Sequence, residues 1–245
     1  LATRAFNGCA AITAVTLPAS LTSIGNGAFI GCSGITTIDI PDGVVTIGAM
    51  AFAGCDGLTA VALPANLAAV ENGLFRSCSN LAAVSMGDNV TAIGDKAFWK
   101  CAKLKTVSFS DALLSIGENA FQECPLESID PGSALEVVGY YAFYDCSSLT
   151  HVTLPGTVTD LRYQAFYGCD KLTSLTLAGT GEWACTYDMS ILASQCKTLT
   201  IEAGITAIGA IGFAPETVNC NAVTPPAIDE GTFTSYDGTL YVPEG

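Results

Sequence analysis

The sequence has few of the residues on which catalysis and nucleic-acid binding depend. It contains one histidine, and 9 lysines and arginines stand against 23 aspartates and glutamates, for a formal net charge of −14. A single histidine limits acid–base and metal chemistry. Nucleic-acid binding rests on basic residues that meet phosphates, so the acidity argues against a nucleic-acid partner.

Long hydrophobic runs are also missing. Proline, glycine, threonine or a charge interrupts each apolar stretch before it reaches the roughly 20 residues of a membrane span, so we expect no transmembrane segment in this chain. Half of the residues are nevertheless apolar and only 13% are charged, which argues against intrinsic disorder. The chain is therefore expected to fold around a substantial apolar core.

Phenylalanine and cysteine recur together at a fixed period. Eight phenylalanines follow one another in steps of 23 or, once, 22 residues, and a cysteine stands three residues after each of them. These phenylalanines are Phe6, Phe29, Phe52, Phe75, Phe98, Phe121, Phe143 and Phe166. The unit reads I-G-x-x-A-F-x-x-C-x-x-L-x-x-V-x-L-P, and Phe213 and Phe233 fit the same frame. A period of this length indicates a solenoid in which each unit forms one coil.

Each part of the unit predicts a local structure. The L-x-x-V-x-L segment alternates and ends at proline, which is typical of a short strand with an inward apolar side. The A-F-x-x-C piece is too short for a stable helix and fits one helical turn. A glycine precedes it in most units, where we expect a tight turn or a positive φ. These glycines are Gly25, Gly48, Gly94, Gly117 and Gly139.

The unit resembles the leucine-rich repeats of BspA-like, or Treponema-type, bacterial surface proteins. Its clearest copy runs from Ile24 and Gly25 through Phe29 and Cys32 to Pro41. The resemblance covers nearly the whole chain. It implies a right-handed leucine-rich-repeat solenoid, export to the cell surface or the extracellular space, and adhesion or ligand binding without catalysis.

We predict one domain over residues 1–245, made of about eleven 23-residue coils. Short parallel β-strands and single helical turns would give a β-rich α/β architecture. Residues 178–205 lose the repeat phenylalanine and form a degenerate repeat, and residues 206–245 hold the C-terminal repeats. Leu1 stands at the isoleucine position of a unit, so we expect the natural protein to contain residues before it.

Eight of the eleven cysteines share one repeat position and should stack in a file beside the phenylalanines. Bridging such parallel side chains would require strained rotation, so we expect free, buried thiols that act as small apolar residues. The ladder is clearest at Phe29, Phe52, Phe75, Phe98, Cys32, Cys55, Cys78 and Cys101. A bridge between Cys185 and Cys196, which lie off the file, stays open. No C-x-x-C pair occurs, so we expect neither a metal site nor another cofactor.

The single histidine, His151, is expected on an outward strand position. A hydrolytic triad would need a nucleophile and an acid beside it, and neighbouring coils would bring Ser128 or Ser174 and Asp130 near. We interpret His151 as a surface residue of a polar sheet and expect no enzymatic activity. Small outward strand residues around it form a second surface on which a solenoid could bind partners.

Aromatic residues gather in a few successive units. Tyrosine, tryptophan and arginine are the residue types enriched at binding hot spots. The candidate binding residues are Trp99, Tyr140, Tyr141, Tyr144, His151, Arg162, Tyr163 and Tyr167. Lateral packing over the turns is the competing interpretation of the aromatic members.

We therefore expect a non-catalytic recognition module of a bacterial surface protein, with a protein ligand on a host or neighbouring cell. A structural spacer that displays another domain, and carbohydrate binding through the Tyr/Trp residues, are the alternatives. Residues 1–105 hold six cations and six anions, whereas residues 106–245 hold three cations and seventeen anions. A partner of the acidic part should be basic, and its binding should be sensitive to salt.

Overall fold

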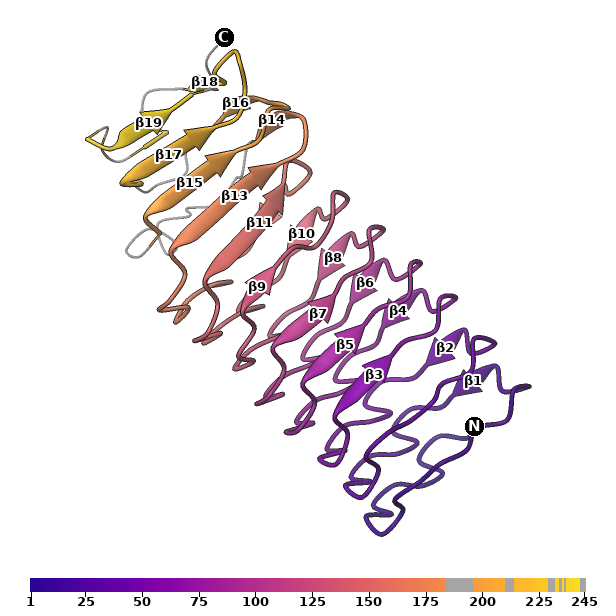
Figure 1. Cartoon of the computed structure of the whole chain (residues 1–245). Coiled ribbons are helices and arrows are strands. Elements are labelled where there is room, and N and C mark those ends of the chain that lie inside the picture. The colour runs from indigo at the N-terminus through magenta and orange to yellow at the C-terminus, as the bar shows by residue number, and fades with distance from the viewer. Residues whose placement is uncertain (184–195, 210–213, 229–231, 234, 236, 243–245) are drawn as a thin grey trace.

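The computed structural model shows a parallel β-solenoid whose coils stack from one end of the chain to the other (Figure 1). It describes residues 1–183, 196–209, 214–228, 232–233, 235 and 237–242. The N-terminus lies at one end of the stack and the C-terminus at the other, and two rows of strands run along it (Figure 1). The predicted leucine-rich-repeat solenoid is confirmed.

One row, the long-strand face, comes from the V-x-L part of each unit. Its strands pair in parallel with a shift of about one repeat, for example Ala60 with Ala83 and His151 with Ser174. The strands are β3 (Ala60–Ala62), β5 (Ala83–Ser85), β7 (Thr106–Ser108), β9 (Ser128–Ile129), β11 (His151–Pro155), β13 (Ser174–Ala178), β15 (Thr198–Ile201), β17 (Thr217–Cys220) and β19 (Thr239–Tyr241).

On the long-strand face the described residues thus form about nine turns that contain a strand, fewer than the eleven expected. The equivalent segments of the first two units, around Val15 and Ile38, form no strand. The first coil packs on only one neighbour, and its inward residues Ile12, Val15 and Leu17 are half-buried.

The other row, the short-strand face, comes from the segment before the repeat glycine. It also pairs in parallel, as in Ser115 with Val137. Its strands are β1 (Ser23–Ile24), β2 (Thr46–Ile47), β4 (Ala69–Val70), β6 (Ala92–Ile93), β8 (Ser115–Ile116), β10 (Val137–Val138), β12 (Asp160–Leu161), β14 (Gly181–Trp183), β16 (Ile205–Ile208) and β18 (Ala227–Ile228).

The third side of each coil is a chain of turns, and the helical turn expected there was wrong: the described residues contain no helix. Around Phe29 the chain closes i→i+3 turns, with the Cys32 N–H donating to the Phe29 carbonyl at 3.1 Å. The Phe29 N–H instead donates to Ala51 of the next coil at 2.8 Å. We call this side, from three residues before to three after each repeat phenylalanine, the turn face.

Left-handed backbone conformations explain why no helix forms. In all eight units from Phe6 to Phe166, φ is positive two residues before and two residues after the phenylalanine, as at Lys96 (57°) and Lys100 (60°). A right-handed helix needs negative φ throughout. The positive values redirect N–H groups toward the adjacent coil, so the turn face gains hydrogen bonds between coils that a helical turn would keep within one coil.

The repeat glycines begin the expected tight turn, with the Ala97 N–H donating to the Gly94 carbonyl at 3.3 Å, but they do not have positive φ. A β-carbon built on Gly94 would lie 2.7 Å from the backbone nitrogen of Asn72, and one on Gly117 would lie 2.7 Å from that of Asp95. Only glycine lets the backbones of adjacent coils approach this closely. At Gly94 and Gly117 the absence of a β-carbon therefore permits this close approach.

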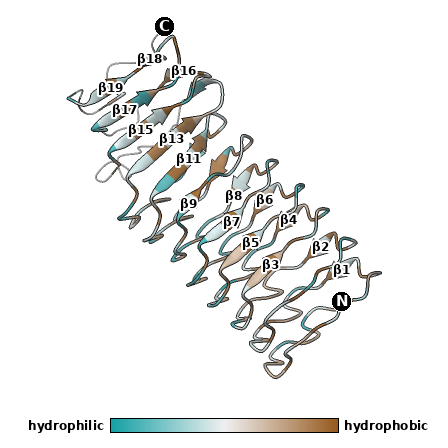
Figure 2. Ribbon diagram, in the orientation of Figure 1, coloured by the Kyte–Doolittle hydropathy of each residue, from teal (hydrophilic) through white to brown (hydrophobic). Residues whose placement is uncertain are grey.

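The core is one continuous file of identical side chains. The eight phenylalanines stack ring on ring with centroids 5.0–5.6 Å apart and planes within 12° of parallel. Repeat leucines, isoleucines and cysteines fill the space beside them, and from Cys32 to Cys169 the ladder cysteines are buried. Figure 2 shows hydrophobic segments recurring from coil to coil along the stack. The predicted Phe and Cys ladders are present.

Candidate recognition surface

The turn face presents files of side chains in which each unit contributes one member. The residue after the repeat phenylalanine changes along the stack from small to aromatic. From the first unit to the eighth, this file contains Asn7, Ile30, Ala53, Arg76, Trp99, Gln122, Tyr144 and Tyr167. Because the backbone repeats, these residues occupy equivalent places one coil apart. The chemistry of the surface therefore changes along an otherwise uniform scaffold.

Four tyrosines from two adjacent coils form one contiguous group, which we call the tyrosine cluster: Tyr141, Tyr144, Tyr163 and Tyr167. Tyr144 stacks on Tyr167 with ring centroids 5.4 Å apart and an angle of 17°. Tyr141 makes edge-to-face contacts with Tyr144 at 5.7 Å and with Tyr163 at 6.5 Å. Tyr163 is 56% exposed and Tyr167 is 47% exposed. The cluster is thus ordered by its own contacts and accessible to a partner.

Tyr140 and Arg162 lie beside this cluster and contact each other. The Arg162 guanidinium lies over the Tyr140 ring, 5.4 Å from its centroid. Its Nε also donates to a carboxylate oxygen of Asp160 at 2.9 Å, which fixes the direction of the side chain. Tyr140 remains 40% exposed.

Trp99 belongs to a separate group, two coils before Tyr144. The Arg76 guanidinium and the Lys100 ammonium lie 4.5 Å and 4.6 Å from the centroid of its ring. The aromatic residues grouped together from the sequence therefore divide into a cationic group and the tyrosine cluster. Arg76 was missed as a site residue, although it precedes Trp99 by one repeat in the same file and could have been found from that spacing.

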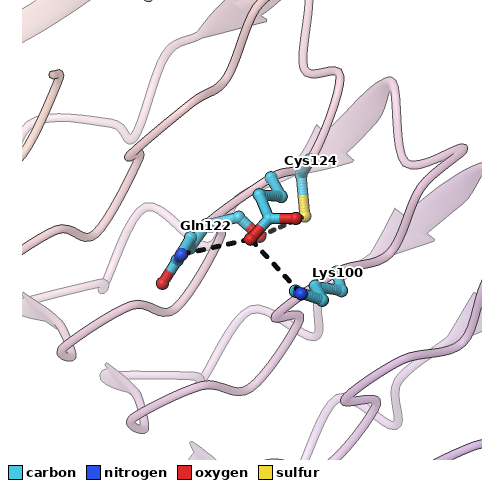
Figure 3. A network of polar contacts seen from close by, with 4 residues as sticks. Lys100, Gln122 and Cys124 are labelled. Atoms are coloured by element: carbon cyan, nitrogen blue, oxygen red, sulfur yellow. Dashed lines mark hydrogen bonds and ion pairs between the residues drawn. The ribbon is translucent and has the colours of Figure 1, made fainter. Parts of the chain in front are cut away.

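The boundary between the two groups is marked by a small polar network (Figure 3). The Glu123 carboxylate forms an ion pair with the Lys100 ammonium at 3.6 Å. It also accepts a hydrogen bond from the side-chain amide of Gln122 at 3.2 Å. Behind it, the Cys124 thiol lies 4.0 Å from the Gln122 carbonyl and 3.0 Å from the Phe98 carbonyl of the preceding coil. The ion pair therefore holds Lys100 beside Trp99. In the next two coils the residue at the position equivalent to Lys100, two residues after the repeat phenylalanine, is acidic, and these residues lead toward the tyrosine cluster.

Asp145 is the acidic residue that adjoins the tyrosine cluster directly. Partial burial and the neighbouring charges of Glu123 and Asp170 raise the pKa of its carboxyl group. The negative charge of Asp145 in turn is the main cause that raises the pKa of the Tyr144 hydroxyl. Like charges raise the pKa of an acid when no cation offsets them. The surface around Tyr144 therefore has a negative potential.

His151 lies on the long-strand face, away from both aromatic groups. Its Nδ1 lies 3.1 Å from the Ser174 hydroxyl, and its Nε2 lies 3.4 Å from the hydroxyls of Thr153 and Thr176. Hydroxyl neighbours on both ring nitrogens satisfy a neutral imidazole. Ser174 is one of the two serines considered for a triad, but among the described residues the polar contacts of the His151 ring are all with hydroxyls.

The cysteine file adds a hydrogen bond that the sequence did not reveal. From Cys32 to Cys169, each buried thiol donates to the carbonyl of the repeat phenylalanine in the preceding coil, at 3.0–3.2 Å. Burial is the main cause that raises the pKa of five of these thiols, to about 12 for Cys55; the five are Cys32, Cys55, Cys78, Cys101 and Cys146. Cys9 is exposed, and Cys196 is a free, buried thiol. Its suggested partner Cys185 lies outside the described residues.

Two further features are absent from the described part of the chain. It contains no group of three or more His, Cys, Asp or Glu residues that could hold a metal ion. It also contains no helix long and apolar enough to cross a membrane.

Comparison with known proteins identifies the repeat. A family model described as the BspA-type leucine-rich repeat region matches residues 1–127 and 114–230, with six copies. The chain belongs to the BspA-type leucine-rich repeat family. No curated protein matches it.

A solved structure supports the same fold for this BspA-type repeat protein. The chain is similar to a leucine-rich repeat protein from Bacteroides ovatus, with 23% identity over 98% of this chain and a TM-score of 0.69. The chain spans 65% of the length of that protein. A leucine-rich cell surface protein from Faecalibacterium prausnitzii is 26% identical over 73% of this chain and 63% of its own, with a TM-score of 0.49. A T. pallidum leucine-rich repeat protein is 30% identical over 66% of this chain and 72% of its own, also with a TM-score of 0.49.

Proposed function

We propose that this chain is a non-catalytic recognition module of a bacterial cell-surface protein and that it binds a protein partner through the tyrosine cluster. The cluster itself is the observation that carries this proposal. Tyrosines are enriched at hot spots because they provide a large contact area with few rotatable bonds. Here their contacts with one another hold them in place, which reduces the entropy lost on binding.

The ring geometry favours a protein partner over a carbohydrate. A sugar stacks on an open ring face, but Tyr144 and Tyr167 turn a face toward each other at 5.4 Å. Edges and hydroxyl groups then provide much of the contact that remains, together with the exposed ring of Tyr163. Edges and hydroxyls match the mixed apolar and polar surface of a protein.

The same surface argues against a role as a spacer alone. Coils whose turn face has no aromatic residue besides the repeat phenylalanine, such as those with Ala53 and Ile30, stack as well as the others, with ring contacts of 5.3–5.6 Å between Phe29, Phe52 and Phe75. The tyrosines are therefore not needed to hold the stack. Non-catalytic function and surface export are what membership of the repeat family favours.

A binding screen with paired variants tests the proposal. The chain is screened against arrays of host extracellular proteins and glycans, and each interaction is then measured with Tyr144→Ala plus Tyr167→Ala. We expect the affinity for a protein ligand to fall about 10-fold or more, because hot-spot residues contribute 1.4 kcal/mol and above. Trp99→Ala, at the same position of the file two coils earlier, is the matched control and should change the affinity less than about threefold. The proposal fails if the tyrosine variant leaves every interaction unchanged.

A further inference from the structure

The turn face contains two aromatic groups that differ in the charge of the residues around them. In the described part of the chain, Arg76 and Lys100 make cation–π contacts with the Trp99 ring, and Arg162 makes one with the Tyr140 ring. None falls on the four rings of the tyrosine cluster. Cations bind aromatic rings favourably, with more gain when the pair is shielded from water. The cluster therefore has the rings for such a contact but not the cation.

The acidic residues beside the cluster are also incompletely neutralised. Within the described residues, no lysine or arginine nitrogen lies within 4 Å of the Asp145 carboxylate. Glu123 has Lys100 at 3.6 Å, with both side chains about half exposed. Exposed pairs of this kind are weak and screened by salt, so they leave much of the negative field in place.

The charge of the surrounding chain has the same sign. Residues 106–245 contain three cations against seventeen anions. Of these cations, Arg162 is paired with Asp160 and Lys197 with Glu216, each at 2.9 Å. A negative field of this extent attracts basic ligands and speeds their association.

Taking the tyrosine cluster as the binding surface of the proposed function, we infer that its partner presents a basic segment. Arginine or lysine side chains of that segment would pair with the Asp145 and Glu123 carboxylates and pack against Tyr144 and Tyr163. Arginine suits this surface better than lysine, because its planar guanidinium both pairs with a carboxylate and stacks on a ring. The contact of Arg162 with Asp160 and Tyr140 shows the same pairing within the chain itself.

The test uses a hexa-arginine peptide and its neutral analogue hexa-citrulline, which has nearly the same shape. Binding is measured by calorimetry, and the contact is located by NMR of the chain with carbon-13-labelled tyrosine rings. We expect hexa-arginine to bind at least 10-fold more tightly than hexa-citrulline and to shift the signals of the tyrosine cluster. The affinity should fall several-fold when sodium chloride is raised from 50 to 300 mM, since charged contacts are screened by salt.

Charge-neutralising variants separate a specific site from general attraction. Glu123→Gln with Asp145→Asn should weaken hexa-arginine at least fivefold, and both changes keep the size of the side chain. Asp39→Asn with Asp88→Asn removes the same charge from exposed positions off the turn face and should weaken it less than twofold. The inference would be overturned if both double variants lost the same affinity for hexa-arginine, or if hexa-citrulline bound as tightly as hexa-arginine.

These outcomes are distinct from those of the proposed function. A protein ligand lost with Tyr144→Ala plus Tyr167→Ala but unaffected by Glu123→Gln plus Asp145→Asn would support protein recognition and exclude a basic partner. A second copy of the chain, using Arg76 and Lys100 as its basic group, is the competing occupant. Concentration-dependent dimerisation in sedimentation, abolished by Glu123→Gln plus Asp145→Asn, would replace the inferred partner with that copy.

Discussion

The regular coils from Phe29 to Phe166 and the C-terminal strands β15–β19 are held together differently. In the regular coils most strands have only two or three residues, and the stacked phenylalanines and buried cysteines recur in every unit. In the C-terminal part β15 and β17 have four residues each, and the residues of β18 and β19 are exposed. In the first region, stacked phenylalanines and thiol hydrogen bonds thus link neighbouring coils.

The thiols show the difference most directly. In the regular coils each thiol donates to a carbonyl of the preceding coil at 3.0–3.2 Å, as Cys101 does to Phe75. In the C-terminal part Cys196 and Cys220 lie 3.6 Å and 3.8 Å from carbonyls two residues further along their own chain segment. A strict period therefore turns a weak side-chain donor into a link between coils, and this link is lost when the period is lost.

The largest expected effect comes from breaking the phenylalanine ladder. Phe98 is fully buried and stacks on Phe75 at 5.5 Å and on Phe121 at 5.0 Å. Phe98→Ala should lower the free energy of unfolding by about 3–5 kcal/mol, because it leaves a cavity in a close-packed core. Leu240→Ala in β19, where the side chain is 60% exposed, should change it by less than about 0.5 kcal/mol. Urea unfolding followed by circular dichroism measures both, and similar losses at the two positions would refute the comparison.

The next effect is a loss of stability at alkaline pH. Burial raises the pKa of the Cys55 thiol from the ordinary value of 9.0 to about 12, and it raises the pKa of Cys78 and Cys101 well above 9.0. A thiol in the unfolded chain ionises first, so the stabilisation is complete below about pH 9 and is lost as the pH rises toward 12.

Urea unfolding at a series of pH values from 7.5 to 10.5 checks this expectation. The free energy of unfolding should fall above pH 9, and it should fall less steeply in Cys55→Ala with Cys78→Ala. Cys220→Ala, outside the ladder, is the control and should leave the slope close to that of the unaltered chain. A flat profile, or a slope that does not depend on the ladder cysteines, would contradict the interpretation.

The smallest effect concerns the left-handed positions. The regular coils place nine residues other than glycine at positive φ, whereas in the described residues after Gln164 only glycines have positive φ. Lys96 has a φ of 57°, and glycine already stands at the equivalent positions 27 and 73. Lys96→Gly should stabilise the chain by up to about 1 kcal/mol by relieving this strain. Lys105→Gly, at a position where φ is not positive, should destabilise the chain. A loss of stability of similar size in both variants would show that Lys96 is not strained.

Much of the fold was predictable because the same residues recur at the same spacing. The regular recurrence of Phe29, Cys32 and Pro41 in the repeat predicted the coil, the parallel stacking and the buried file of phenylalanines and cysteines from the sequence alone. The turn face was not predictable, because an i→i+3 turn and one helical turn have the same short apolar pattern. Residues such as Lys96 and Tyr141 have no intrinsic preference for positive φ, so the hydrogen bonds between coils must impose it.

The candidate surface was predictable in composition but not in grouping. The sequence placed Arg76, Trp99 and Tyr144 in one file, and the structure showed that the Arg76 and Lys100 cations lie against the Trp99 ring. Contacts between files depend on the distance between side chains in neighbouring coils. The spacing of residues along the sequence does not give that distance. Asp145 was overlooked for the same reason, since its importance comes from Tyr144, Glu123 and Asp170 together.

The sequence by itself determined the repeat, the identity of the core residues and the acidic character of the second half. These follow from composition and spacing, because like residues at one period must stack once the chain coils. The tertiary structure decided the conformation of the turns, the thiol hydrogen bonds and the division of the aromatic residues into a cationic group and the tyrosine cluster. These depend on how closely adjacent coils approach, a distance that the linear sequence does not state and that at Gly94 and Gly117 leaves no room for a β-carbon.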